Sequence, residues 1–184
     1  TIEQCVAYEN GYLTADEENT ILGEGNGFSL GGESMPVANI LKNSIAYNNL
    51  ENGVFSNSNP NCQIYNVTSY NNGGSNIKLN TSATKTAWVV NGFVSYLGGK
   101  ADEFDNRTQT LEHISTNYYT NQVTDLWFES LRTSVYPEII EDGSIDMHGL
   151  LKLTSVAAGG ASISSNESPT TIEIGKEIST NESP

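Results

Sequence analysis

Residues 41–73, LKNSIAYNNLENGVFSNSNPNCQIYNVTSYNNG, contain one pattern twice. A strand-like segment ends in a tyrosine, Tyr47 or Tyr70, and a pair of asparagines follows at once. A second short apolar segment begins seven residues after each tyrosine, at Val54 and at Ile77. Strand-forming segments that recur at fixed positions and are separated by Asn and Gly are typical of a repeat protein.

The first segment of this pattern occurs four times, and it ends at Tyr8, Tyr47, Tyr70 and Tyr96. The spacings are 39, 23 and 26 residues, and the long one contains the acidic insertion YLTADEENTILGEG. Without that insertion the period falls in the low-to-mid twenties, which is the length of one coil of a β-solenoid. A sandwich of antiparallel hairpins would instead show strict polar and apolar alternation with tight two-residue turns. We therefore predict an all-β protein whose four tyrosines stack in register.

The alignment also predicts which other residues lie above one another. Ile45 aligns with Val6 and Val94, and we expect all three to point into the core. The second strand of each coil is predicted at matching places, Phe28-Ser29-Leu30, Val54-Phe55-Ser56 and Ile77-Lys78-Leu79. Three asparagines follow the tyrosines, where a short amide tolerates left-handed backbone and can bond its neighbour in the next coil; they are Asn10, Asn49 and Asn72.

The repeats fade along the chain, and this predicts three parts. Residues 1–120 are expected to form the coils, and residues 121–155 an irregular segment in which Trp127 and Phe128 cover the open end of the core. Residues 156–184, rich in Ser, Thr, Gly and Glu, are expected to be a linker-like or disordered tail. Because the chain begins directly in strand-like sequence, we expect it to be a fragment that lacks its upstream part.

The charge of the chain limits its partners. It carries 22 acidic and 8 basic residues, a net charge of −14, so a nucleic-acid backbone would be repelled. No apolar run approaches the about 18 residues of a membrane span. A polyanionic polysaccharide would be repelled as well, unless a cation bridged the two sets of carboxylates. Cys5 and Cys62 fit neither a disulfide framework nor a zinc site, and we interpret them as small buried apolar residues.

The glycine-rich stretch GEGNGFSLGG, residues 23–32, and the stretch GVFSNSNP, residues 53–60, carry a family resemblance. At their mutual spacing they resemble the latter half of a pectate lyase of polysaccharide lyase family 9, most clearly over residues 1–80. The resemblance implies a right-handed single-stranded parallel β-helix that is secreted and cleaves polygalacturonate by calcium-assisted β-elimination. In that reaction a base removes the proton on C5, and a cation stabilises the charge that develops on the neighbouring carboxylate.

The chain departs from that family at two places. The resemblance implies a catalytic lysine inside the motif GNGF-x-LGG, and Ser29 stands at its position. A serine hydroxyl without a partner is a weak base, so this position is predicted to be non-functional. The resemblance also implies calcium-binding aspartates in a DDGWD-like cluster, and the sequence contains no such cluster. We therefore identify no metal-ligating residue and no cofactor of this chain.

Other residues are candidates for weaker roles. Lys78 occupies the place of Ser29 two coils further on, about 10 Å away at about 4.8 Å per coil. It is a candidate to replace the missing base and also a candidate for substrate binding. Lys42 and Arg107 are further candidates for substrate binding, because their charges suit uronate carboxylates. Two acidic runs are interpreted as solvated surface, and they are Asp16, Glu17 and Glu18, and Asp102, Glu103 and Asp105. His113 and His148 are interpreted as structural or exposed residues.

Three hypotheses about function stay open. The chain is a segment of a polygalacturonate lyase whose calcium site lies elsewhere or is lost, or a degenerate homologue that binds acidic polysaccharide without cleaving it. The third hypothesis is a structural, adhesin-like solenoid with no role in glycan binding. The first two predict a secreted protein whose partner is an acidic plant polysaccharide, and all three predict a chain that is itself inactive.

Overall fold

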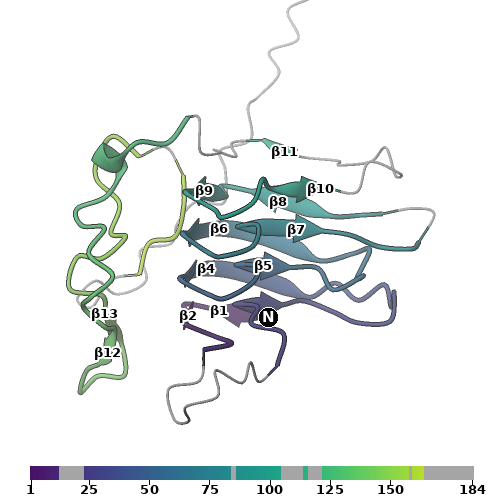
Figure 1. Cartoon of the computed structure of the whole chain (residues 1–184), viewed down its shortest axis with the longest axis horizontal. Coiled ribbons are helices and arrows are strands. Elements are labelled where there is room, and N and C mark those ends of the chain that lie inside the picture. Colours follow the sequence, from purple (N-terminus) through teal and green to yellow (C-terminus); the bar gives the residue numbers. More distant parts are fainter. Residues whose placement is uncertain (13–22, 84–85, 105–113, 116–121, 158, 164–184) are drawn as a thin grey trace, which may run out of the picture.

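The computed structural model describes residues 1–12, 23–83, 86–104, 114–115, 122–157 and 159–163. Its described part is built from short strands, with one turn of 3-10 helix, η1 (Asp125–Trp127) (Figure 1). The strands of the coils are β1 (Ile2–Glu3), β2 (Val6–Tyr8), β3 (Phe28–Ser29), β4 (Ile40–Tyr47), β5 (Val54–Phe55), β6 (Gln63–Tyr70), β7 (Ile77–Leu79), β8 (Val89–Asn91), β9 (Val94–Tyr96), β10 (Glu103–Phe104) and β11 (Ile114–Ser115). The last two strands are β12 (Glu138–Ile139) and β13 (Ile145–Asp146).

The strands of the coils pair only in parallel. One sheet has the order β1-β4-β6-β8-β11, with β2 on β4 and β9 on β6, and the other has the order β10-β7-β5-β3. Each strand therefore pairs with the equivalent strand one coil away, which makes a parallel β-helix and confirms the predicted fold class. Antiparallel pairing occurs between β12 and β13, outside the coils.

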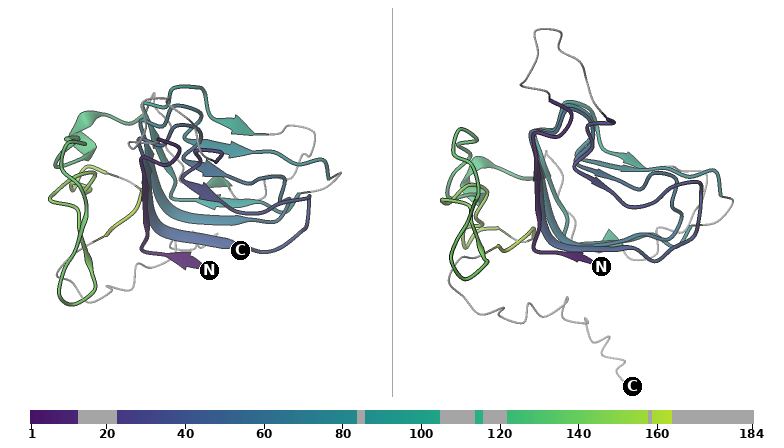
Figure 2. Two further views of the ribbon diagram at one scale, coloured as in Figure 1. Left: turned by 60° about the horizontal axis from the view of Figure 1, so that its bottom comes forward. Right: turned by 90° about the horizontal axis from the view of Figure 1, so that it is seen from below.

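The larger sheet turns a corner inside β4 and β6. Asn43 and Asn66 have φ angles of 46° and 49°, and neither belongs to the paired register that continues on both sides of it. Gly92 occupies the corner of the next coil with φ 69°, where an added Cβ would lie 2.2 Å from the side-chain oxygen of Asn66. Figure 2 (right) shows the coils superimposed, with this corner between the two arms of the larger sheet. A left-handed backbone favours Asn and Gly, so these residues place the corner.

The interior of the coils is an apolar core. Trp88 is buried there, and its ring nitrogen donates a hydrogen bond to the backbone oxygen of Asn59 at 2.6 Å. Cys62 is a buried free thiol in this core, as predicted. Cys5 is also a free thiol, but it is only half-buried and packs against the core. The buried members of this inner core are Phe28, Leu30, Leu41, Ala46, Val54, Cys62, Ile64, Val67, Ile77, Leu79, Trp88, Val90 and Phe93.

A second apolar cluster lies outside the coils, and it corrects the prediction for Ile45. Ile45 pairs in register with Val6, and Val94 is in the same column. All three belong to this outer cluster, whereas Ala46 of the same strand belongs to the inner core. The corner at Asn43 reverses which side chains of the strand point inward and which point outward. The outward side chains after the corner are covered by the C-terminal segment, residues 122–157 and 159–163. In Figure 2 (right) that segment, green to yellow, lies beside one arm of the sheet.

The tyrosine column is confirmed and belongs to the same outer cluster. Tyr8, Tyr47, Tyr70 and Tyr96 are paired in register from coil to coil. The rings of Tyr8 and Tyr47 stack with centroids 5.3 Å apart, and those of Tyr70 and Tyr96 stack at 6.1 Å. Phe128 stacks on Tyr96 at 5.9 Å, so it extends this column on the outer face and does not cover the end of the inner core as predicted.

The predicted asparagine ladder is also present, with one change. Asn10 donates its backbone and side-chain N–H groups to the side-chain oxygen of Asn49, and Asn49 does the same to Asn72. The left-handed residues, however, are Glu9, Asn48 and Asn71, each immediately after a tyrosine and one position before the ladder. The first residue of each turn makes the bend, and the second residue forms the ladder, buried at Asn49 and Asn72 and exposed at Asn10.

The predicted boundaries of the three parts remain predictions. The C-terminal segment continues beyond Val156, since Ala161 is buried and its N–H donates to the Thr68 hydroxyl at 2.9 Å. Ile163 also packs against the outer cluster, and residues 164–184 lie outside the described part. No helix in the described part has the length and apolar character of a membrane span.

Candidate functional site

The candidate site is a row of side chains on the outer face of the smaller sheet. Ser29 is exposed between buried Phe28 and Leu30, so it faces solvent as the alternation of the strand predicts. Its partner in the next coil is Phe55, which is half-buried, and the partner of Phe55 is Lys78. The same register continues from Lys78 to Glu103. The structure thus brings Ser29 and Lys78 onto one face, two coils apart.

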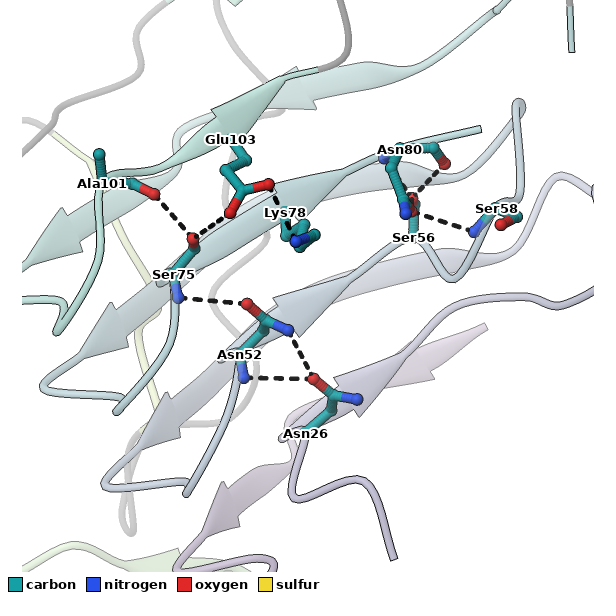
Figure 3. A network of polar contacts seen from close by, with 9 residues as sticks. All are labelled: Asn26, Asn52, Ser56, Ser58, Ser75, Lys78, Asn80, Ala101 and Glu103. Carbon is teal, nitrogen blue, oxygen red and sulfur yellow. Dashed lines mark hydrogen bonds and ion pairs between the residues drawn. The ribbon is translucent and has the colours of Figure 1, made fainter. Parts of the chain in front are cut away.

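Lys78 is not free on this face. Its ammonium nitrogen lies 2.9 Å from Oε2 of Glu103, and the side chains of the two residues are 29% and 48% exposed. Figure 3 shows the lysine and the carboxylate pointing toward one another. The other carboxylate oxygen, Oε1, lies 3.5 Å from the Ser75 hydroxyl, which also donates to the backbone oxygen of Ala101 at 2.7 Å.

Two polar networks flank the row and hold the coils in place. On one side the Asn52 amide donates to Asn26 at 2.9 Å, and the Ser75 backbone N–H donates to Asn52 at 3.1 Å (Figure 3). On the other side the Ser56 hydroxyl donates to the backbone oxygen of Asn80 at 2.9 Å. These bonds cross from coil to coil, so the row is carried on a rigid surface.

The other two predicted substrate-binding residues do not join the row. Lys42 lies on β4, in the other sheet, where its ammonium nitrogen pairs with Oε2 of Glu3 at 2.9 Å. Arg107 lies outside the described residues, as do Asp16, Glu17, Glu18, Asp105 and His113. His148 lies between two carboxylates near the β12–β13 hairpin, with Nδ1 3.3 Å from Asp146 and Nε2 3.7 Å from Glu138. The roles of these residues remain predictions.

The described acidic residues do not form a cluster that could hold a calcium ion. Calcium takes several convergent oxygen ligands, and no group of three His, Cys, Asp or Glu side chains that could hold a metal occurs in the described ranges. The two carboxylates nearest the row are engaged otherwise, since Glu103 pairs with Lys78 and Asp102 accepts the backbone N–H of Ile77 at 3.0 Å. No chemical step of this chain is therefore assigned to a metal.

Asp102 lies at the end of the hydrogen-bond chain that continues from the asparagine ladder, and its pKa is raised. The amide of Asn76 accepts from Asn72 and donates to the Ser95 hydroxyl, which hydrogen-bonds to Asp102. Partial burial raises the pKa of Asp102 above its ordinary value of 3.8, although the bonds from Ser95 and from the N–H groups of Ile77 and Asn76 act in the opposite direction. The folded chain therefore binds a proton at Asp102 more readily than the unfolded chain does.

This shift predicts a pH dependence of stability at Asp102. A raised folded pKa stabilises the fold below pH 3.8, and that contribution is lost as the pH rises through the raised pKa. As the pH rises through that pKa, we expect the free energy of unfolding of the Asp102→Asn variant to increase relative to that of the unmodified chain. Urea unfolding at a series of pH values measures the difference. Asp142→Asn is the control of opposite sign, because bonds from Ser144 lower the pKa of Asp142. A difference for Asp102→Asn that is independent of pH would contradict the assignment.

Phe55 and Glu103 were not singled out as candidates from the sequence. The signal for Phe55 was present, because it is the middle residue of Val54-Phe55-Ser56 and so shares the place of Ser29 and Lys78. Glu103 was interpreted as part of a solvated acidic run, since the fourth repeat is too irregular to show its register. The pairing of β10 with β7 places it above Lys78.

Comparison with known proteins agrees with this fold. Residues 1–91 match the family model described as a Pel9A-like, right handed β-helix region. The chain is 50% identical over 97 residues to pectate lyase L of Thermoclostridium stercorarium, which covers 52% of this chain and 8% of that protein. It is 32% identical over 170 residues to pectate lyase L of Paenibacillus polymyxa (strain SC2), covering 83% of this chain and 34% of that protein.

A solved structure is similar over nearly all of the chain. The crystal structure of pectate lyase Pel9A superimposes with a TM-score of 0.64 and 25% sequence identity, covering 91% of this chain and 41% of that one. This chain thus spans about a third of the Paenibacillus relative and less than half of the solved structure. The matches confirm the right-handed β-helix and the predicted relationship. The chain is thus similar to the pectate lyases of polysaccharide lyase family 9, and its residues 1–91 match a Pel9A-like right-handed β-helix region.

Proposed function

We propose that the chain is a segment or degenerate homologue of a secreted polygalacturonate lyase, and that by itself it does not cleave its substrate. The observation that supports this is the environment of Ser29. Its side chain is exposed at the position of the expected base, and no described side chain hydrogen-bonds to it. The nearest amine in the row, Lys78, lies two coils away and is paired with Glu103.

The chemistry explains why this environment matters. In β-elimination a base takes the proton from C5, a double bond forms between C4 and C5, and the bond from C4 to the leaving oxygen breaks. A hydroxyl that has no base to take its own proton does not remove a proton from carbon at a useful rate. The amine of Lys78 is already engaged in an ion pair, since its nitrogen lies 2.9 Å from Oε2 of Glu103. The described carboxylates form no cluster that could hold the calcium ion of the family.

The unmodified chain is therefore expected to show no eliminative cleavage of polygalacturonate with added calcium. Loss of a general base alone lowers a rate by about 10²- to 10⁴-fold. The measurement is the ultraviolet absorbance of the unsaturated uronide product. Robust calcium-dependent turnover would contradict the proposal, and Lys78→Gln would then test whether that amine acts as the base.

The Ser29→Lys variant separates the two proposed defects. We expect it to stay at background as well, because the described carboxylates do not converge on a metal. Ser29→Met is the matched control, since it has a similar length and no amine. Turnover by Ser29→Lys that is absent from Ser29→Met would show that the base is the only missing group.

A second candidate is a non-catalytic binder of acidic polysaccharide. Phe55 and Lys78 favour it, because a half-buried ring and an ammonium group lie next to each other on one face. Secretion is part of both candidates, since a polymeric plant substrate is met outside the cell. Fractionation of the native host's culture would test it.

A further inference from the structure

The face that carries Ser29 combines an aromatic ring with a cation, although the chain as a whole has a net charge of −14. Phe55 is not a member of the inner core, and it points out of the sheet while its neighbours Val54 and Ser56 are buried. Lys78 is next to it in register, one coil away. A ring that stacks on a sugar and an ammonium group that meets a carboxylate are complementary to one uronate residue.

Glu103 occupies the place that a uronate carboxylate would take. Its Oε2 lies 2.9 Å from the ammonium nitrogen of Lys78, a distance typical of a charge-assisted hydrogen bond. It reaches Lys78 from the next coil, on the side away from Phe55. The free chain thus holds a carboxylate of its own on the cation of this face.

We propose that Phe55 and Lys78 form a subsite for one uronate residue, and that Glu103 sets its affinity by competing for Lys78. This inference rests on the proposed function, because it takes the ligand to be oligogalacturonate. Binding exchanges one carboxylate for another at Lys78, so the free chain binds weakly. Glu103 can replace the uronate carboxylate at Lys78, but it cannot replace the contact between the sugar ring and Phe55.

The pair can be displaced because little else holds Glu103. Nearly half of its side chain is exposed, and exposed ion pairs contribute little to stability. Among the described residues its second contact is the Ser75 hydroxyl at 3.5 Å, which is too long for a strong hydrogen bond. That hydroxyl has a single proton and a closer acceptor, the backbone oxygen of Ala101 at 2.7 Å.

The chain supplies a matched control in the ion pair between Glu3 and Lys42. It also joins neighbouring coils in register, has the same 2.9 Å separation and is similarly exposed, but it lies on the other sheet. Glu103→Gln and Glu3→Gln therefore make the same change of net charge. Only the first frees a lysine beside Phe55.

The test is calorimetric binding of a galacturonate hexamer at low salt, with a chelator present so that calcium plays no part. We expect Glu103→Gln to bind about three- to tenfold more tightly than the unmodified chain, and Glu3→Gln to bind within twofold of it. In the Glu103→Gln background, Lys78→Met should abolish the gain and Phe55→Leu should weaken binding about threefold or more. The methyl-esterified hexamer should show no gain, because it has no carboxylate. Thermal unfolding checks that each variant is folded.

Equal tightening by both glutamine variants would overturn the proposal, since it would reflect net charge alone. No tightening by Glu103→Gln, or no binding by any variant, would overturn it as well. These results are independent of the absorbance assay. Turnover by the unmodified chain would refute the proposed function and leave the binding comparison valid, whereas a silent assay with no effect of Glu103→Gln would refute only the subsite.

Discussion

Replacing Ile45 by lysine is expected to lower the free energy of unfolding by about 4 kcal/mol. Ile45 is 1% exposed, because its side chain lies between the sheet and the C-terminal segment. A lysine at this place would bury an ammonium group, and the surrounding side chains of the outer cluster are largely apolar or aromatic. Urea unfolding followed by circular dichroism measures the loss.

Ile40→Lys is the matched control for that substitution. Ile40 lies on the same strand before the corner at Asn43, it is half-buried, and the neighbouring Leu41 points into the inner core. A lysine at residue 40 can extend its charge into water, so we expect a cost of about 1 kcal/mol or less. Equal stability of the two variants would show that the C-terminal segment does not cover Ile45 in solution.

Replacing Asn72 by alanine is expected to cost about 3–5 kcal/mol, because it removes the centre of the asparagine ladder. Asn72 is 1% exposed and accepts two hydrogen bonds from Asn49, at 3.0 and 2.8 Å. Its amide donates to Ser69 at 3.0 Å and to Asn76 at 2.8 Å. Alanine leaves several of these buried groups without a partner, and each costs about 1–3 kcal/mol. Urea unfolding measures this loss too.

The control for the ladder is its immediate neighbour, Asn71. Its amide donates to Asn48 at 2.8 Å on the exposed side of the same turn. Asn71→Gly removes this bond and keeps the left-handed backbone, whose φ is 50°, so we expect a cost of about 1 kcal/mol or less. Similar losses for Asn72→Ala and Asn71→Gly would mean that the inner ladder adds nothing beyond an ordinary surface hydrogen bond.

The features that the sequence predicted correctly depend on the repeat itself. In a stack of parallel coils, residues at equal places in the repeat are neighbours in space, so alignment alone gave the register of the tyrosines and of Ser29 with Lys78. The outward direction of Ser29 followed from the alternation of a single strand. The absence of a base at that position is likewise a property of residue type.

What the sequence predicted incorrectly depends on contacts between segments that do not repeat. The alignment of Ile45 with Val6 and Val94 predicts that it points into the core. The left-handed Asn43 instead makes the strand turn a corner, and Ile45 lies in the outer cluster. An asparagine within a strand-like segment is not enough to predict such a bend from the sequence. The burial of Ile45 comes from the C-terminal segment, whose residues match no repeat position.

The sequence by itself thus determined the stacked coils, their register and the serine at the position of the expected base, since each follows from local pattern and residue identity. Only the tertiary structure decided which apolar side chains form the inner core, and that Lys78 faces Glu103 beside Phe55. The first outcome depends on the corner at Asn43. The second depends on how β10 of the irregular fourth coil pairs with β7 of the third coil. Side-chain direction at a bend and pairing across coils are set by packing and electrostatics in three dimensions, which no period in the sequence encodes.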